Sequence, residues 1–363
     1  MVAPLLPAAA PYRKAPRADM HRAQAPSRAR LAGRLALAST VATTIALASC
    51  SSASEAAPDY RCVKLVDGDS ELGGEVTSVG DVAYVGGAST ISVFDLSNPS
   101  DPRALAPLPF PQRVEAIATG GGRLIAAGAQ VLHVFDVSNP KAPSKIGEVM
   151  TGSTATNALV TDGHWAYAGT PNGTVTVFDV SGASPLLVTQ SASGGPLPIT
   201  DLVLHDDTLY AAGGVALSFV PFDVRRREQP VPSPAVAMNG NVNGMTFADG
   251  ALFAYTTAAA GQLIAHRLDV SAPLDPHETA RASTSCDGCG GGGRAAQVTT
   301  AHGQFVVPTP YGKAIFSWDL ALAGSYHDFA ATCFPDRYAI SHVHGVGTTL
   351  VVTGNSAIAF LVP

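Results

Sequence analysis

The chain has 363 residues, of which 46% are hydrophobic and only 14% charged, with 36 glycines and 27 prolines. This composition indicates a globular protein built from many short elements and turns. Residues 50–363 carry fifteen basic against twenty-seven acidic residues, and a body this acidic repels a phosphate backbone, so no nucleic-acid partner is expected.

The N-terminal segment, residues 1–49, is typical of a secretory signal peptide. Three arginines (Arg28, Arg30 and Arg34) precede a mostly apolar run, Leu35–Ala48. A helix needs about 20 residues to span a bilayer, so this run is too short to do so. Met20 is an alternative start, which would give a signal of more ordinary length.

The end of this segment, Leu47-Ala48-Ser49-Cys50, resembles the lipobox of bacterial lipoproteins. The resemblance implies that Cys50 is lipidated and becomes the mature N-terminus, with the bilayer as a partner. Residues 50–59 then form a flexible tether of small and polar residues. Ser51 after the cysteine implies the outer membrane if the cell is Gram-negative. We therefore expect a membrane-anchored lipoprotein of the cell envelope.

A sequence motif that contains Phe-Asp recurs along the body of the chain. TISVFDLSNP at 90–99 is repeated as VLHVFDVSNP at 131–140, and the later copies are less similar. The aspartates that mark the copies are Asp95, Asp136, Asp179, Asp223, Asp269 and Asp319, spaced by 41 to 50 residues. Because an acid at a strand end can accept backbone N–H bonds in the following turn, we interpret this residue as structural.

A fourteen-residue frame precedes each marker phrase and reads as strand, turn, strand. The marker phrase supplies a third strand, and a fourth follows its proline-rich turn, as in 144–149. Four antiparallel strands with a period in the forties are typical of a β-propeller. We predict an all-β, seven-bladed propeller over residues 60–363. Residues 60–67 should supply the outer strand of the seventh blade and so close the ring.

The third strands resemble the LVIVD repeat, a bacterial β-propeller family. Its five-letter core appears as ISVFD, LHVFD and VTVFD, and in degraded form as FVPFD, AHRLD and IFSWD. The resemblance implies the fold and an extracytoplasmic setting. It implies no established activity and no catalytic residues.

The beginnings of the innermost strands are the best place to look for a ligand, since they line the mouth of the central channel. We predict a polar ring there, which could hold a small ligand or a divalent cation. In the alternative interpretation these side chains only satisfy the inner backbone edges. The candidates are Glu115, Asn157, Asp201, Asn243, Gln297, His342 and His344.

Four cysteines remain once Cys50 is lipidated, namely Cys62, Cys286, Cys289 and Cys333. In an oxidising compartment we expect two disulfides. The pairing stays open between Cys286–Cys289 with Cys62–Cys333 and a pairing of Cys333 with Cys286 or Cys289. A zinc site is not favoured, because a second Cys-x-x-Cys is missing.

Two other charged motifs give weaker evidence for a functional site. Arg225–Arg227 is interpreted as a solvated charge cluster, and Asp67–Glu75 lacks the glycine that a calcium loop needs at its sixth place. Hydrolase signatures of the Gly-x-Ser-x-Gly and His-Glu-x-x-His kinds are absent from the sequence. We therefore expect a monomeric binding or scaffold module without a cofactor, for an unknown protein, glycan or small molecule. The alternative is a metal-assisted hydrolase or lactonase centred on Asp201 and His342.

Overall fold

The computed structural model describes most of the body of the chain. The described residues are 60–67, 72–153, 155–192, 198–213, 217–258, 262–285, 299–301, 304–309, 312–317, 325–328, 340–354 and 357–363. The predicted signal segment, Cys50 and the tether lie outside them.

The described strands form seven antiparallel sheets, each of four strands or of four with the outer one split in two. The first three sheets are β2 (Leu72–Val79), β3 (Val82–Gly87), β4 (Thr90–Asp95), β5 (Arg103–Ala104) and β6 (Leu108–Pro109); β7 (Ala116–Gly120), β8 (Arg123–Ala127), β9 (Val131–Asp136) and β10 (Ser144–Met150); and β11 (Ala158–Thr161), β12 (Trp165–Gly169), β13 (Thr174–Asp179) and β14 (Leu186–Ala192).

The next three sheets follow in chain order. They are β15 (Ile199–His205), β16 (Thr208–Gly213), β17 (Ser218–Asp223), β18 (Val231–Pro232) and β19 (Val236–Ala237); β20 (Asn241–Ala248), β21 (Ala251–Ala258), β22 (Gln262–Asp269) and β23 (His277–Ser285); and β24 (Thr299–Ala301), β25 (Gln304–Thr309), β26 (Gly312–Ser317) and β27 (Ser325–Asp328). The all-β propeller with four-stranded antiparallel blades is confirmed.

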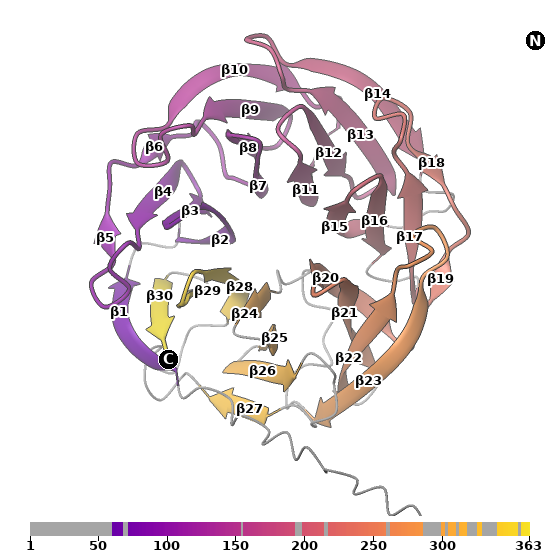
Figure 1. Ribbon diagram of the computed structural model, residues 1–363. Coiled ribbons are helices and arrows are strands. Elements are labelled where there is room, and N and C mark those ends of the chain that lie inside the picture. Colours follow the sequence, from indigo (N-terminus) through magenta and orange to yellow (C-terminus); the bar gives the residue numbers. More distant parts are fainter. Residues whose placement is uncertain are drawn as a thin grey trace, which may run out of the picture. The chain divides into compact units, whose positions relative to one another are not determined.

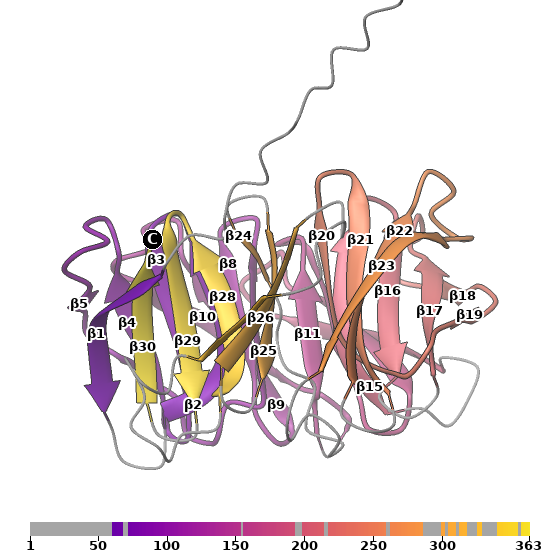
Figure 2. The ribbon, with the colours of Figure 1, turned by 90° about the horizontal axis from the view of Figure 1, so that it is seen from below.

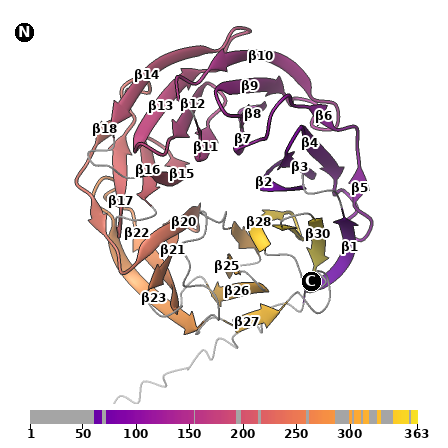
Figure 3. The same ribbon diagram turned by 180° about the vertical axis from the view of Figure 1, so that it is seen from behind.

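The last sheet joins the two ends of the propeller. It contains β28 (Ile340–Val346), β29 (Thr349–Gly354), β30 (Ala357–Val362) and, as its outer strand, β1 (Arg61–Asp67). Figure 3 shows β1 beside β30, and the register pairs Arg61 with Val362 and Asp67 with Ala357. The predicted closure by the N-terminal strand is confirmed.

The sheets stand around a common axis, with β2, β7, β11, β15, β20, β24 and β28 innermost (Figure 1). Each of these inner strands contacts the inner strand of the next sheet, and β28 contacts β2, so the ring is closed. Figure 2 shows the strands running between two faces of the ring. We call the face where the inner strands begin the start face, and the face where they turn into the second strands the turn face.

The core consists of apolar clusters that each join two neighbouring sheets. One cluster packs Tyr84 of β3 against Phe135 of β9, and another packs Phe94 of β4 against Phe360 of β30. The two rings of the second pair meet edge to face, with centroids 4.9 Å apart. Because each blade is covered on both sides, its second strand is a continuous apolar run. β3, β16 and β29 are accordingly buried at every position.

Neighbouring turns approach each other closely on the turn face. Gly121 and Gly163 both have positive φ, at 51° and 94°. A Cβ atom added to Gly163 would lie 2.5 Å from the Cα of Gly121. Glycine is therefore required at this contact, both for its backbone conformation and for space.

Candidate functional site: the central channel

The marker aspartates are structural, as the sequence predicted. The Oδ1 atom of Asp95, Asp136, Asp179, Asp223 and Asp269 accepts the backbone N–H of the residue two positions later, at 2.7 to 3.0 Å. In Asp95 the Lys141 ammonium and this turn lower the carboxyl pKa to about 2. Asp319 lies outside the described residues.

A cavity of about 640 Å³ occupies the middle of the ring. Its lining comes from the inner strands β2, β7, β11, β15, β20, β24 and β28, and from Arg227 in the turn after β17. Of the predicted site residues, Asp201 and His344 lie in this lining. Glu115, Asn157, Asn243 and His342 do not contribute to it, and Gln297 lies outside the described residues.

Three carboxylates at the start face link neighbouring blades. Ile117 N–H donates to Glu75 at 3.0 Å, Thr156 N–H to Glu115 at 2.9 Å, and Met245 N–H to Asp201 at 2.6 Å. In each pair the acid belongs to one blade and the N–H to the next blade. The inner strands thus satisfy their exposed backbone donors with side chains of the preceding blade.

Two predicted amides have structural partners of a similar kind. Asn157 Nδ2 donates to the carbonyl of Ile199 in the next blade at 3.1 Å. Asn243 is buried and its Nδ2 donates to Thr257 Oγ1 at 2.9 Å within its own sheet. Asn157 thus satisfies a backbone carbonyl, the role that the sequence left as the alternative to ligand binding, whereas Asn243 pairs with a side chain of its own sheet.

Two of the four acids in the cavity lining, Glu75 and Asp201, have unusually high pKa values. Burial raises the pKa of Glu75 to about 8, and the Asp201 carboxylate raises it further against the lowering effect of the Ile117 N–H. Burial also raises the pKa of Asp201 to about 7, although two backbone N–H groups, of Met245 and Leu202, oppose the shift. Both carboxyls therefore titrate near neutral pH.

The two histidines of β28 are neutral bases. Burial lowers the pKa of His342 to about 3 and that of His344 to about 4. His344 Nε2 lies 3.0 Å from Ser78 Oγ, across the junction between the last and first blades. His342 Nδ1 is buried without a hydrogen-bond partner within the described part of the chain.

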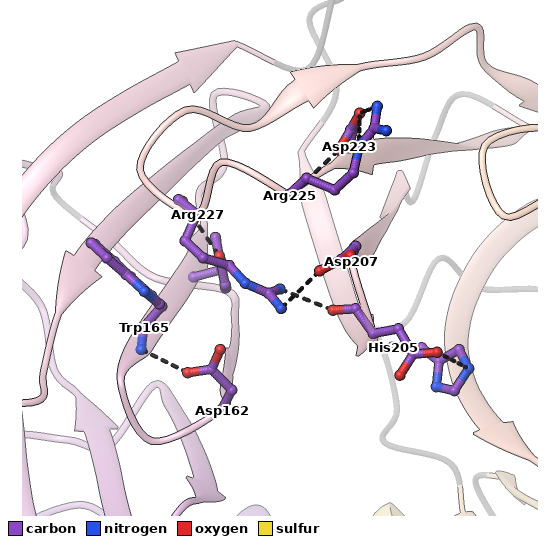
Figure 4. A network of polar contacts seen from close by, with 9 residues as sticks. Asp162, Trp165, His205, Asp207, Asp223, Arg225 and Arg227 are labelled. Carbon is purple, nitrogen blue, oxygen red and sulfur yellow. Dashed lines mark hydrogen bonds and ion pairs between the residues drawn. The ribbon is translucent and has the colours of Figure 1, made fainter.

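At the turn face a second charged group borders the same cavity. Arg227 donates to the Asp207 carboxylate at 3.0 Å and to the carbonyl of Asp206 at 2.9 Å (Figure 4). Its side chain is only 26% exposed, so the predicted solvated cluster at Arg225–Arg227 is wrong for this member. Asp162 and Asp206 complete this mouth of the cavity.

Sequence reasoning missed Glu75 and Arg227. Glu75 occupies in the first unit the place of Ala116 in the second and Asp201 in the fourth, so extending the repeat frame by one unit would have found it. Arg227 gave no such signal, because its position at the cavity depends on the turn between β15 and β16.

Cys62 lies in β1, where it packs against the core cluster of the last sheet and is not a free thiol. Cys286, Cys289 and Cys333 lie outside the described residues, so the disulfide pairing stays a prediction. In the described ranges no group of three or more His, Cys, Asp and Glu side chains is placed to hold a metal ion. The same ranges contain no helix with the length and apolar character of a membrane span.

Comparisons with known proteins agree on the fold. A family model for the LVIVD repeat matches residues 74–105 and 123–151, in the first two blades. The chain therefore carries LVIVD repeats, as predicted. No curated protein matches it.

Many solved structures are similar to the chain. One is a crystal structure of the computationally designed Ika8 protein in a P63 crystal. It has a TM-score of 0.58 and 11% sequence identity, and the match covers 84% of this chain and 100% of the designed one. A likeness at this identity shows the fold alone.

Proposed function

We propose that this protein is a binding module of the cell envelope, held at a membrane by a lipid on Cys50 and carrying its ligand in the central channel. The observation that carries the binding role is the cavity on the ring axis, with Glu75, Asp201 and Arg227 in its lining. These charges differ from blade to blade, whereas the marker aspartates repeat. A closed ring also holds the lining side chains in fixed positions, which lowers the ordering cost of binding.

A variant with a filled channel tests this role. Thr246 lines the cavity and is half-buried, so Thr246→Trp should occupy ligand space. Thermal unfolding would be followed with a chemically mixed panel of amines, sugars, carboxylates and short peptides. We expect at least one compound to raise the Tm of the wild-type protein and not that of Thr246→Trp. Ser184→Trp, at an exposed turn, is the control and should respond like the wild type. A panel without any channel-dependent shift would count against the proposal.

The membrane part of the proposal rests on the lipobox-like sequence before Cys50. A lipid on this residue, together with a short tether, would keep the propeller at a bilayer surface. The full chain expressed in a bacterial host should appear in the membrane fraction, and Cys50→Ser should leave it. Mass spectrometry that finds an unmodified Cys50 in the mature wild-type chain would overturn this part.

Two disulfides among Cys62, Cys286, Cys289 and Cys333 belong to the same proposal, since an exported protein meets an oxidising environment. Thiol titration of the denatured, unreduced protein should find none of these four thiols free. Four free thiols would contradict it.

A further inference from the structure

The cavity carries charge at two levels along the ring axis. At the start level Glu75 of the first sheet and Asp201 of the fourth sheet lie close enough to repel each other electrostatically. At the turn level Asp162, Asp206 and Arg227 line the cavity, and the exposed Asp206 carboxylate lies 3.4 Å from His205 Nε2. Arg227 is already paired with Asp207 at 3.0 Å. The lining thus has an excess of carboxylates at both levels.

The rest of the lining mixes hydroxyl and aliphatic side chains. It contains six threonines, and Val160, Val203 and Leu204 are among its aliphatic members; the threonines are Thr77, Thr119, Thr161, Thr200, Thr246 and Thr299. Hydroxyl oxygens accept hydrogen bonds from ammonium groups, and aliphatic side chains suit methylene groups. A ligand that fits the cavity has positive charge at its ends and a chain of methylenes with further ammonium groups between them.

The strand β15 sets the distance between the levels, because it carries Asp201 near its beginning and leads directly into Asp206. These residues are five positions apart, and a strand rises about 3.3 Å per residue, which gives roughly 16 Å. The ligand must therefore be long and thin rather than compact.

We propose that the channel binds a linear aliphatic polycation of the spermine type, with one ammonium group at the start level and another at the turn level. This inference rests on the proposed function, because it names the ligand class of the same cavity. An ammonium group donates three hydrogen bonds and carries the charge that the two start-level carboxylates need. It replaces their mutual repulsion by attraction.

Binding of this ligand is coupled to protons. Glu75 and Asp201 line the cavity together with the neutral His344, which lies nearer the turn level beside Ser78. Their pKa values of about 8 and about 7 mean that both carboxyls are partly protonated at neutral pH. A bound ammonium stabilises the ionised forms, so protons are released on binding and the affinity rises from pH 6 to pH 8.

Isothermal titration calorimetry with spermine tests the proposal on four variants. Glu75→Gln and Asp201→Asn remove charge and keep an oxygen that accepts the Ile117 and Met245 N–H groups. Each should weaken binding about tenfold. Glu228→Gln and Asp275→Asn remove exposed acids outside the cavity lining and should leave the affinity within about twofold. Equal losses in all four variants would show general attraction to an acidic surface and would overturn the proposal.

A second measurement varies length at constant charge. For α,ω-diamines of increasing chain length, affinity should peak where the ammonium groups span about 16 Å. An affinity that does not depend on length, or no spermine binding at pH 8, would overturn the polycation. The proposed binding function would still stand, without a polycation as the ligand, if another compound of the panel raised the Tm of the wild type and not that of Thr246→Trp.

Discussion

Two sets of carboxylates in this ring make the same hydrogen bond and behave in opposite ways. The marker aspartates on the turn face and the acids at the start level both accept backbone N–H groups. Yet the pKa of Asp95 falls to about 2, whereas that of Glu75 rises to about 8. The hydrogen bonds of Lys141 and Ser97 lower the pKa of Asp95, whereas burial and a second acid, Asp201, raise the pKa of Glu75. Local hydrogen bonding is therefore not what separates structural acids from candidate ligand groups.

The difference also follows the repeat. The marker aspartate holds a turn that every blade needs, so it recurs. The pair Glu75 and Asp201 is formed by different residues of different blades, at positions where other blades carry neutral side chains. In a repeat protein, the departures from the repeat are the better guide to a site.

The largest expected effect comes from removing the acceptor at the start level. Asp201→Ala leaves the N–H groups of Met245 and Leu202 without their acceptor, which should cost about 1–3 kcal/mol of unfolding free energy. Asp201→Asn keeps one of the two accepting oxygens and removes a charge that is costly to bury, so at pH 8 it should destabilise the ring less than Asp201→Ala does. Urea unfolding at pH 8 measures both. Equal destabilisation by Ala and Asn would show that the charge itself stabilises the ring, against the comparison above.

A smaller effect concerns pH. The pKa of Glu75 is about 8 in the folded protein against an ordinary value of 4.5, so the folded state holds the extra proton between these values. Its contribution to stability is full below pH 4.5 and is lost as the pH rises to about 8. Relative to the wild type, Glu75→Gln should therefore gain about 1–2 kcal/mol between pH 5 and pH 8.5.

Measurements above about pH 7 separate this effect from that of Asp201, whose pKa is raised to about 7, and from those of the two histidines of β28. His342 and His344 have lowered pKa values, so their contribution has the opposite sign and is lost as the pH falls below 6.5. A pH profile of Glu75→Gln parallel to that of the wild type would show that Glu75 has an ordinary pKa.

The smallest effect is expected on the turn face. Asp95→Asn keeps the acceptor for Ser97 N–H and loses the ion pair with Lys141, whose Nζ lies 2.6 Å from Oδ2. Because the Lys141 side chain is half-exposed, this pair should contribute about 0.5 kcal/mol at pH 7. Because the pKa of Asp95 is lowered, its contribution is present above pH 3.8 and is lost as the pH falls toward about 2.

A double-mutant cycle with Lys141→Ala measures the coupling. Asp136→Asn is the matched control without a lysine partner and should change stability less. A stabilising Asp95→Asn would show that the charge of Asp95 destabilises the ring, as expected for the channel acids.

The fold could be predicted from the sequence because the repeat encodes it many times. The marker phrase located the third strands, and the N-terminal strand, which has no unit of its own, pairs with β30 in the last sheet as predicted. The site was harder to predict. The frame found Asp201 and His344, but Asn243 occupies a similar frame position and lies inside its sheet. Which start residues reach the cavity depends on local register shifts, such as those between Ile199 and Asp201 and between Val242 and Gly244.

The pairing of β1 with β30 has a consequence for how the chain is made. Cys62 leaves the ribosome first and pairs with Leu361, almost 300 residues later. At synthesis rates of about 5–20 residues per second, β1 waits roughly 15–60 s for its partner. During that interval the blades can form one by one, but the last sheet cannot. The ring can therefore close only once β30 has been synthesised, and until then β1 lacks its partner strand.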